Sequence, residues 1–395
     1  MPDAATGIGA RLEDLRKRRG LSQQELAQAA SVSLSTIRKL EQGEQRDTRL
    51  ETARKLAAAL RVPTTRLLDR GEETPESDHV PEEAWRAVQH AVERPQERGD
   101  LPAPTLDGVE AALAAARAAY FGGDFIALAQ VLPPLLRDTD ALGDSAAARH
   151  VRARVLHFTG AALTQVRQWE GADSALDHAL DAAPDAATAA GIITTRCWLL
   201  LRQGHISNAR VLATKWADDL EPHRVSRATP DDLAAWGWLL LHAGAAAIRD
   251  NREGEAATAM KLAQAAAVLT GRDLGYGRRM NRWGATVVAH KRIENLVITD
   301  QPDRALDLAE RVARVTAALP SDGNFNRHRL DVANAHAKLR HYGEAMETLL
   351  AVNERAPAWL ANQRYARDIL GTIISRRRTL TPEMRQLADD IRLPL

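Results

Sequence analysis

Apolar residues recur every three or four positions in two parts of this 395-residue chain, near the N-terminus and from about Thr105 to the end. This spacing is typical of amphipathic helices, because residues three and four apart share one face of a helix. In the longer part, Gly and Pro fall at segment ends, and no convincing run alternates with the two-residue period of a strand. The pattern predicts an all-α protein.

The N-terminal pattern, within residues 21–43, predicts two short helices joined by a tight turn. Ser22 is the expected N-cap of the first helix, with Glu25 as its capping-box partner. Ser33 is expected to cap the second helix, and Gly43 to end it. The apolar faces would be Leu26, Ala27 and Ala30 in the first helix, and Ile37 and Leu40 in the second. Such a pair places its second helix to enter a DNA major groove.

These residue identities resemble the phage-repressor (Xre/Cro-type) helix-turn-helix family. The resemblance covers roughly residues 8–69 and implies a complete five-helix DNA-binding domain over residues 1–70. It also implies that Arg16 pairs with Glu41 and so locks the first helix onto the recognition helix. Ser31 occupies the turn position that usually holds Gly, so its backbone must be left-handed. The matching positions include Leu15, Arg19, Gly20, Leu21, Gln23, Val32, Leu50, Leu56, Ala57, Ala59, Leu60, Val62, Leu67 and Leu68.

The resemblance also assigns candidate DNA contacts. Gln23 would present an amide to a phosphate or a base edge, and Leu34 and Thr36 would contact a thymine methyl group. Arg46 and Arg49, in the following loop, would contact the DNA backbone or the minor groove. The full set is Gln23, Ser33, Leu34, Ser35, Thr36, Arg38, Lys39, Arg46 and Arg49.

Charge divides the N-terminal part of the chain in two. Residues 1–70 carry 14 Lys and Arg against 9 Asp and Glu, which suits phosphate neutralisation. Residues 71–104 carry 3 against 9 and contain five prolines, which predicts an acidic linker. A helical pattern over residues 82–93 predicts one short docking helix in this linker. A solvated spacer is the alternative for the linker's outer parts.

A weak internal repeat organises residues 105–395. Helix-turn-helix joints are expected at residues 121–128, 166–176, 202–212, 249–259, 299–309 and 340–350. The small residues that open each second helix are Ala172, Ala209, Ala256, Ala305 and Ala345, with spacings of 37, 47, 49 and 40. These spacings exceed the 34 residues of a regular tetratricopeptide repeat, so helices or loops must be longer. The repeat predicts a tetratricopeptide-like α-solenoid, with a generic helical bundle as the alternative.

The C-terminal half of bacterial one-component regulators resembles four segments of this chain, which are residues 234–241, 249–256, 327–349 and 363–370. Those proteins join an Xre-type domain to tetratricopeptide repeats. Related regulators of the Rgg/PlcR type have the same domain order, dimerise through the solenoid and bind signal peptides along its concave face. The resemblance therefore implies an effector, either a peptide or a small molecule.

Counting back from each small residue identifies first-helix positions that face the concave side. Aromatic rings beside amides and cations are suited to holding an extended peptide. Only Asn334 is a good candidate among the amides that peptide-sensing relatives use, which weakens the case for a peptide. The candidate ligand residues are Arg154, His157, Gln165, Thr194, Trp198, Trp238, Arg249, His290, Glu294, Arg327, Asn334 and Lys338.

A homodimer that reads an inverted-repeat operator is expected, because one such domain reads only about half a turn of groove. The C-terminal helices, around residues 365–374 and 384–391, are the expected contact. Their apolar residues Leu370, Ile373, Ile374, Leu387 and Ile391 exceed the needs of a terminal cap. The alternative is a capping pair that buries these residues internally.

Enzymatic chemistry has little support in the sequence. No Gly-rich phosphate loop, Rossmann fingerprint or HExxH motif occurs, and the 12 His and single Cys197 show no metal-ligand spacing. We therefore expect no enzyme activity, metal or cofactor. Cys197 suits a reducing cytoplasm, and no signal peptide or transmembrane run is visible.

Two classes of function remain. In the first, the protein is a ligand-responsive transcription regulator. In the second, it is a DNA-tethered adaptor whose solenoid binds a protein partner. A polar and aromatic groove would favour the first, and an open apolar patch the second. An antitoxin repressor is disfavoured, because antitoxins seldom need so long a solenoid.

Overall fold

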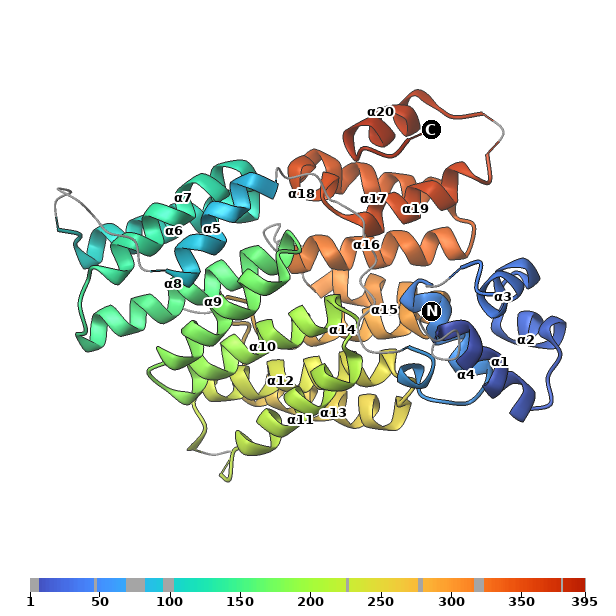
Figure 1. Cartoon of the computed structure of the whole chain (residues 1–395), viewed down its shortest axis with the longest axis horizontal. Helices are drawn as coiled ribbons and strands as arrows, with labels where there is room; N and C mark the ends of the chain where they lie inside the picture. Colours follow the sequence, from blue (N-terminus) through green and yellow to red (C-terminus); the bar gives the residue numbers. More distant parts are fainter. Residues whose placement is uncertain are drawn as a thin grey trace, which may run out of the picture.

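The computed structural model describes residues 7–45, 48–68, 82–94, 103–224, 227–275, 280–315, 323–377 and 379–394. Regular structure in these ranges is helical, and their only isolated bridge pairs Leu274 with Trp283. The prediction of an all-α fold with an N-terminal helix-turn-helix domain is confirmed (Figure 1). No helix in the described part of the chain is long and apolar enough to cross a bilayer.

We call residues 7–68 the head. Its elements are α1 (Ile8–Arg18), α2 (Gln23–Ala30), α3 (Leu34–Glu41), α4 (Leu50–Ala59) and the 3₁₀ helix η1 (Thr64–Arg66). The capping box of Ser22 and Glu25 is present, and the Ser33 side chain accepts from the amide of Thr36. Ser31 adopts the expected left-handed conformation, with φ 52° and ψ 42°. The turn between α2 and α3 therefore forms without glycine.

The linker helix α5 (Glu82–Glu93) packs against α7 and α9 of the following region. Its residues Trp85 and Val88 are fully buried in the same core cluster as Leu128 and Phe158. This apolar contact fixes the helix on the first repeats, because burying a large side chain contributes about 1.5–3 kcal/mol.

The rest of the chain is a series of helix pairs. The pairs are α6 (Leu106–Gly122) with α7 (Phe125–Asp140), α8 (Ala146–Gln165) with α9 (Trp169–Asp181), α10 (Ala186–Arg202) with α11 (Ile206–Asp219), α12 (Pro230–Arg249) with α13 (Glu253–Thr270), α14 (Ala285–Ile298) with α15 (Pro302–Val315), and α16 (Gly323–Lys338) with α17 (Tyr342–Arg355). Three helices follow, which are α18 (Pro357–Ala361), α19 (Arg364–Ile374) and α20 (Pro382–Asp390).

Every joint between paired helices contains one residue in the left-handed backbone conformation. A left-handed residue stands two positions before the first residue of each second helix. These residues are Gly123, Arg167, Gly204, Asn251, Asp300 and Arg340. The five small residues that predicted the repeat are all buried. They let the two helices of a pair approach closely, so the pairs share one geometry although their lengths differ.

The pairs stack through their first helices, since α6, α8, α10, α12, α14 and α16 each pack on the next. The short helix α18, which follows the last pair, packs against α6, so the end of the stack meets its beginning. At this contact, a Cβ on Gly123 would lie 2.5 Å from the backbone nitrogen of Trp359. The superhelix is therefore closed around its centre (Figure 1).

The closing contact can be tested with two glycines of nearly equal backbone conformation. Gly123 has φ +78°, and Gly143 has φ +76° with nothing near a Cβ. We expect Ala at either position to lose about 1 kcal/mol for the left-handed backbone. Gly123→Ala should lose a further 1–3 kcal/mol, roughly the overpacking penalty, because α18 must move away from α6. Denaturant unfolding of both variants measures the difference, and equal losses would show that the contact contributes nothing.

The apolar residues of the C-terminal helices do not form the exposed surface expected for a dimer contact. Leu370, Ile373, Leu387 and Ile391 are buried in the core formed with α16 and α17, and Ile374 packs against it. These positions therefore fit the alternative interpretation, in which a capping pair of helices buries its apolar residues internally. Their apolar excess covers the end of the last pair, so it offers no surface to a second copy.

Candidate functional site

The head is locked by a buried ion pair between α1 and α3. The Arg16 guanidinium donates to both carboxylate oxygens of Glu41, each over 2.7 Å, and to the carbonyl oxygen of Leu21. Burial alone would raise the pKa of Glu41, but hydrogen bonds from Arg16 and Gln23 hold that pKa below its usual value. The predicted Arg16–Glu41 contact is confirmed. Such a bidentate pair fixes the recognition helix α3 in angle as well as in place.

The Gln23 side chain contacts Glu41 within the head, a contact that the sequence did not predict. Its amide nitrogen donates to the Glu41 carboxylate over 2.7 Å, and its side chain is half-buried. The amide group is thus part of the lock between α2 and α3. The expectation of a Gln23 amide directed at DNA missed this contact, because the sequence alone does not show which side of α2 faces Glu41.

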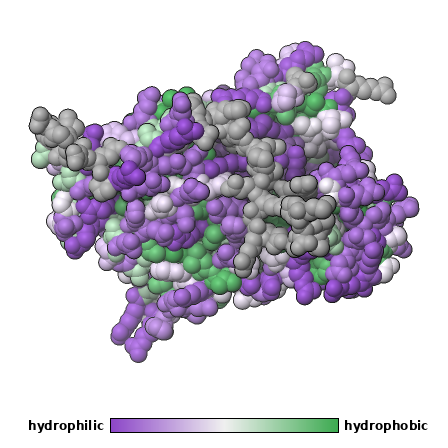
Figure 2. Space-filling view, viewed as in Figure 1, coloured by the Kyte–Doolittle hydropathy of each residue, from purple (hydrophilic) through white to green (hydrophobic). Residues whose placement is uncertain are grey.

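The outer face of α3 is the candidate DNA-reading surface. Ser35, Arg38 and Lys39 are exposed, whereas Leu34 and Thr36 are half-buried. The Ser33 hydroxyl is within hydrogen-bond distance of both Ser35 and Thr36, so it is engaged in capping the helix. The visible surface of the head is mostly hydrophilic (Figure 2). Ser35, Arg38 and Lys39 are therefore the α3 side chains best placed to reach base edges and phosphates.

The two loop arginines have different outcomes. Arg49 pairs with Asp368 of α19 over 3.1 Å, so in this structure it contacts the solenoid. Arg46 lies outside the described residues. Their assignment to DNA contact stays a prediction.

The head docks on the repeat region through α4 and η1, on a side that leaves the outer face of α3 exposed. Arg54 donates to the Asn251 side chain over 3.0 Å and contacts the carbonyl oxygen of Ile298. Thr65 donates to the Asp250 carboxylate through both its amide and its hydroxyl, over 3.0 and 2.9 Å. The Thr64 hydroxyl donates to the backbone carbonyl of Arg249 over 2.7 Å. Four of these contacts fall on the joint between α12 and α13.

This docking interface is desolvated. Arg54 is 8% exposed and Asp250 1% exposed, and burial lowers the pKa of the Arg54 guanidinium. Leu50 and Leu68 of the head pack on the buried residues Ile206, Ala209 and Ala246. Hydrogen bonds to a buried charged group stabilise by about 1.5–3 kcal/mol, which is more than exposed ion pairs contribute. Arg54 is thus a buried, charged anchor of the head.

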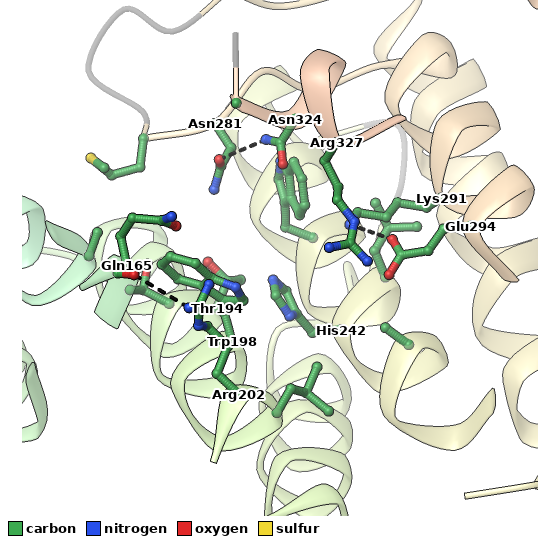
Figure 3. A pocket seen from close by; sticks show the side chains of 18 of the residues that line it. Gln165, Thr194, Trp198, Arg202, His242, Asn281, Lys291, Glu294, Asn324 and Arg327 are labelled. Carbon is green, nitrogen blue, oxygen red and sulfur yellow. Dashed lines mark hydrogen bonds and ion pairs between the residues drawn. The ribbon is translucent and has the colours of Figure 1, made fainter. Parts of the chain in front are cut away.

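A cavity of about 300 Å³ lies at the centre of the closed superhelix (Figure 3). Its wall is formed mainly by the first helices of the pairs, as the repeat predicts. Seven of the twelve residues proposed for the concave face line it, and their role in ligand binding stays a prediction. They are Gln165, Thr194, Trp198, Trp238, Arg249, Glu294 and Arg327.

One wall of the cavity holds a charge cluster. Glu294 accepts from Arg249 over 2.5 Å and from Lys291 over 2.8 Å. Burial alone would raise the pKa of the Glu294 carboxyl, but these two cations keep that pKa well below its usual value. Arg327 lies 3.7 Å from the carboxylate of Asp331, whose pKa burial raises to about 6. This wall is therefore an internally paired network.

Aromatic side chains cover much of the remaining wall. Trp238 is buried and donates its indole N–H to the backbone carbonyl of Arg282 over 2.9 Å. His242 stands beside it, and burial together with the Lys291 cation lowers the pKa of its imidazole to about 3. The ring is therefore neutral near pH 7. The cavity thus combines flat apolar faces with a neutral imidazole and several cations.

The other five candidates lie off this cavity wall. Arg154 pairs with Glu110 over 2.5 Å, and Lys338 pairs with Asp300 over 2.8 Å. His157 is buried against the Thr195 hydroxyl, and His290 stacks on His328 with ring centroids 3.9 Å apart. Asn334 hydrogen-bonds with Tyr365, so the one amide thought suited to a peptide backbone serves packing between α16 and α19. Helical spacing identified a cavity-lining helix in each case. It did not identify which turn of that helix reaches the cavity.

Sequence reasoning also missed several residues of the cavity wall. Arg202 and His242 follow Trp198 and Trp238 by four positions, so the i,i+4 rule would have added them to the same helix faces. Lys291 precedes Glu294 by three positions on α14. The asparagines Asn281 and Asn324, which hydrogen-bond to each other over 3.0 Å, lie at a loop and at a helix start. Trp359 reaches the cavity only because α18 closes the ring, which no local pattern shows.

The described residues contain no group of three His, Cys, Asp or Glu placed to hold a metal ion. Cys197 is buried, which raises the pKa of its thiol to about 12.

Comparison with known proteins identifies the class of the head. A family model described as Helix-turn-helix matches residues 12–67, so the head is a helix-turn-helix DNA-binding domain. No curated protein matches the chain.

Two solved structures resemble the chain at low similarity. One is the apo form of ComR from S. thermophilus, with 12% identity and a TM-score of 0.29, covering 87% of this chain and 98% of that one. The other is ComR from S. thermophilus in complex with DNA and its signalling peptide ComS, with 12% identity and a TM-score of 0.25, covering 93% and 99%. Similarity at this level says nothing about what the present chain binds.

Proposed function

We propose that the protein is a cytoplasmic transcription regulator. Its head reads an inverted-repeat operator as part of a homodimer, and its central cavity binds an effector that alters DNA binding. The protein acts by binding alone, without enzymatic chemistry. The effector belongs to the class of peptides or small molecules.

The observation that supports this function is the position of Arg249. Its guanidinium donates to Glu294 in the cavity wall, while its backbone carbonyl accepts from Thr64 of the head. The next two residues, Asp250 and Asn251, hold Thr65 and Arg54. An effector that moves Arg249 therefore also moves the segment on which the head is docked. Such a coupling requires the effector to bind one placement of the head more tightly than the other.

The test begins with the operator. The full-length protein should enrich an inverted repeat from a random pool of duplex DNA, with half-site centres about 34 Å or a multiple apart. Light scattering at micromolar concentration should give the mass of a dimer. Enrichment of a single half-site by a monomer would contradict the proposed dimer.

Coupling is then tested by filling the cavity. Ala245 lines the cavity, and its carbonyl oxygen accepts from the Arg249 guanidinium over 2.9 Å. Ala245→Phe places a ring beside Arg249, and we expect it to change operator affinity at least fivefold, the lower range of known allosteric couplings. Ala114→Phe, on the exposed face of α6, is the control. Equal operator affinities in a folded Ala245→Phe protein would contradict the coupling.

The adaptor alternative has one observation in its favour. Leu262, Val268 and Leu269 of α13 are 38%, 66% and 49% exposed, which is unusual for apolar side chains so close in sequence. A protein partner that protects α13 from hydrogen exchange while the cavity stays empty would favour the adaptor.

A further inference from the structure

Helix α13 carries apolar side chains on the face that points away from the rest of the protein. Leu262, Val268 and Leu269 are exposed there, while the opposite face of α13 is buried against α12. Clustered apolar side chains at a surface are typical of a contact with another molecule. The C-terminal helices bury their own apolar residues, so the proposed dimer needs a contact elsewhere, and this face of α13 is the candidate.

Side-chain size changes along the exposed face of α13. Its N-terminal half presents the small residues Gly254, Ala257 and Thr258, which are all exposed. Its C-terminal half presents Val268 and Leu269. Two copies of this face pack most closely when they run antiparallel, because the bulky end of each helix then lies on the small end of the other. In a parallel pair, small residues would face small residues and leave a gap.

Charge changes along α13 in the same sense. Glu253 and Glu255 lie exposed in its first turn, and Arg272 is exposed directly after its C-terminal cap. The carboxylate of Asp273, the next residue, accepts from the Thr286 hydroxyl over 2.7 Å and is therefore engaged with α14. An antiparallel pair places the acidic end of each helix beside the basic end of the other, whereas a parallel pair places like charges together. Shape and charge thus favour the same self-pairing.

The position of the head fits this arrangement. The head docks on residues 249–251, directly before α13 begins. Because α13 has 18 residues, an antiparallel pair holds the two docking joints at opposite ends of a seam about 27 Å long. The half-sites of an inverted repeat lie roughly 34 Å apart. The pairing therefore separates the two heads on the scale of one turn of DNA.

Helix α11 lies beside the same face and extends it. Arg210 of α11 pairs with Glu255 over 3.1 Å. Glu255, Leu262 and Leu269 recur every seven positions, so the two leucines lie on the side of α13 that faces α11. Val211 of α11 is also exposed. A second copy of α13 would therefore contact apolar side chains from two helices, which brings the buried area closer to that of a stable dimer.

We infer that the exposed face of α13 is the dimer interface of this protein, formed by two copies of α13 that pack antiparallel across a two-fold axis near Leu262. This inference rests on the proposed homodimer and names the surface that forms it. A different protein partner, as in the adaptor alternative, would not require this face to be complementary to itself.

The double variant Leu262→Glu, Leu269→Glu tests the interface in the full-length protein. Both side chains are exposed, so circular dichroism should show an unchanged fold. We expect the Kd of the dimer, measured by analytical ultracentrifugation, to rise at least about a hundredfold, since carboxylates would replace two central apolar contacts. Leu106→Glu, Ile126→Glu is the control, because it makes the same change at exposed apolar positions of α6 and α7 and should leave the dimer intact.

Charge reversal tests the antiparallel orientation. Glu253→Arg and Arg272→Glu should each weaken the dimer about threefold to tenfold, because each places like charges together at both ends of the seam. The protein with both substitutions should recover most of the wild-type affinity, because opposite charges face each other again. Losses that add up in this double variant would overturn the antiparallel packing.

The mass of the wild-type protein separates this inference from the proposed function. A wild-type dimer that survives Leu262→Glu, Leu269→Glu overturns the α13 interface and leaves the proposed dimeric regulator standing. A wild-type protein that is monomeric both free and on the operator contradicts the proposed homodimer, and the inference with it. Protection of α13 from hydrogen exchange by another protein, and not by a higher concentration of this one, would overturn the inference in favour of the adaptor.

Discussion

We expect the double variant Ser35→Glu, Lys39→Glu to lose specific DNA binding while the head keeps its fold. Both side chains are exposed on α3, and neither belongs to the buried core of the head. The change removes a hydroxyl and a cation and places two carboxylates against DNA phosphates. Each lost base contact costs about 1–3 kcal/mol, and the added repulsion acts on every phosphate nearby. Together these effects amount to a loss of about a thousandfold or more in operator affinity.

Fluorescence anisotropy with the selected operator measures this loss, and circular dichroism confirms the fold. The control is Arg18→Glu, Gln28→Glu, which changes the net charge of the head by the same amount at exposed positions on α1 and α2. The control should lose much less affinity, because only the long-range part of the electrostatic effect remains. Equal losses in the two proteins would show that α3 reads no bases.

Local sequence signals were sufficient for the elements of this fold. The capping box at Ser22, the apolar face ending at Leu40 and the recurring small residues each depend on neighbours within one or two helical turns. Helices, joints and their order could therefore be predicted. The Arg16–Glu41 contact spans 25 residues, and only the family resemblance indicated it.

Contacts between distant repeats could not be predicted in this way. The cavity depends on α18 meeting α6, and the docking of the head depends on Arg54 reaching Asn251, 197 residues away. Neither contact leaves a periodic pattern in the sequence, because each joins a few residues that lie far apart along the chain. Lys338 and Asn334 were placed on the concave face for the same reason. Their partners, Asp300 and Tyr365, lie on other helices or joints, and helical spacing does not show such contacts.

The second large effect concerns the docking of the head on the solenoid. We expect Arg54→Ala to release the head from this docked position. The Arg54 guanidinium is buried, and its removal leaves the Asn251 side chain and the Ile298 carbonyl without that donor. Losing hydrogen bonds to a buried charged group costs about 2–3 kcal/mol, which corresponds to a thirtyfold or larger increase in the undocked population.

The amide of Thr65 is the most direct probe of this release, because it donates to Asp250 across the interface. Its hydrogen exchange, measured by NMR or mass spectrometry, should accelerate about thirtyfold in Arg54→Ala and stay unchanged in Arg38→Ala, where the lost cation is exposed on α3. If docking sets the placement of two heads on an inverted repeat, Arg54→Ala should also make operator affinity insensitive to Ala245→Phe. Arg54 contacts Asn251 in the α12–α13 joint, two positions after the cavity residue Arg249, so its removal weakens this link between the cavity and the head. Unchanged exchange at Thr65 would contradict the anchoring role of Arg54, and a persisting effect of Ala245→Phe would place the coupling elsewhere.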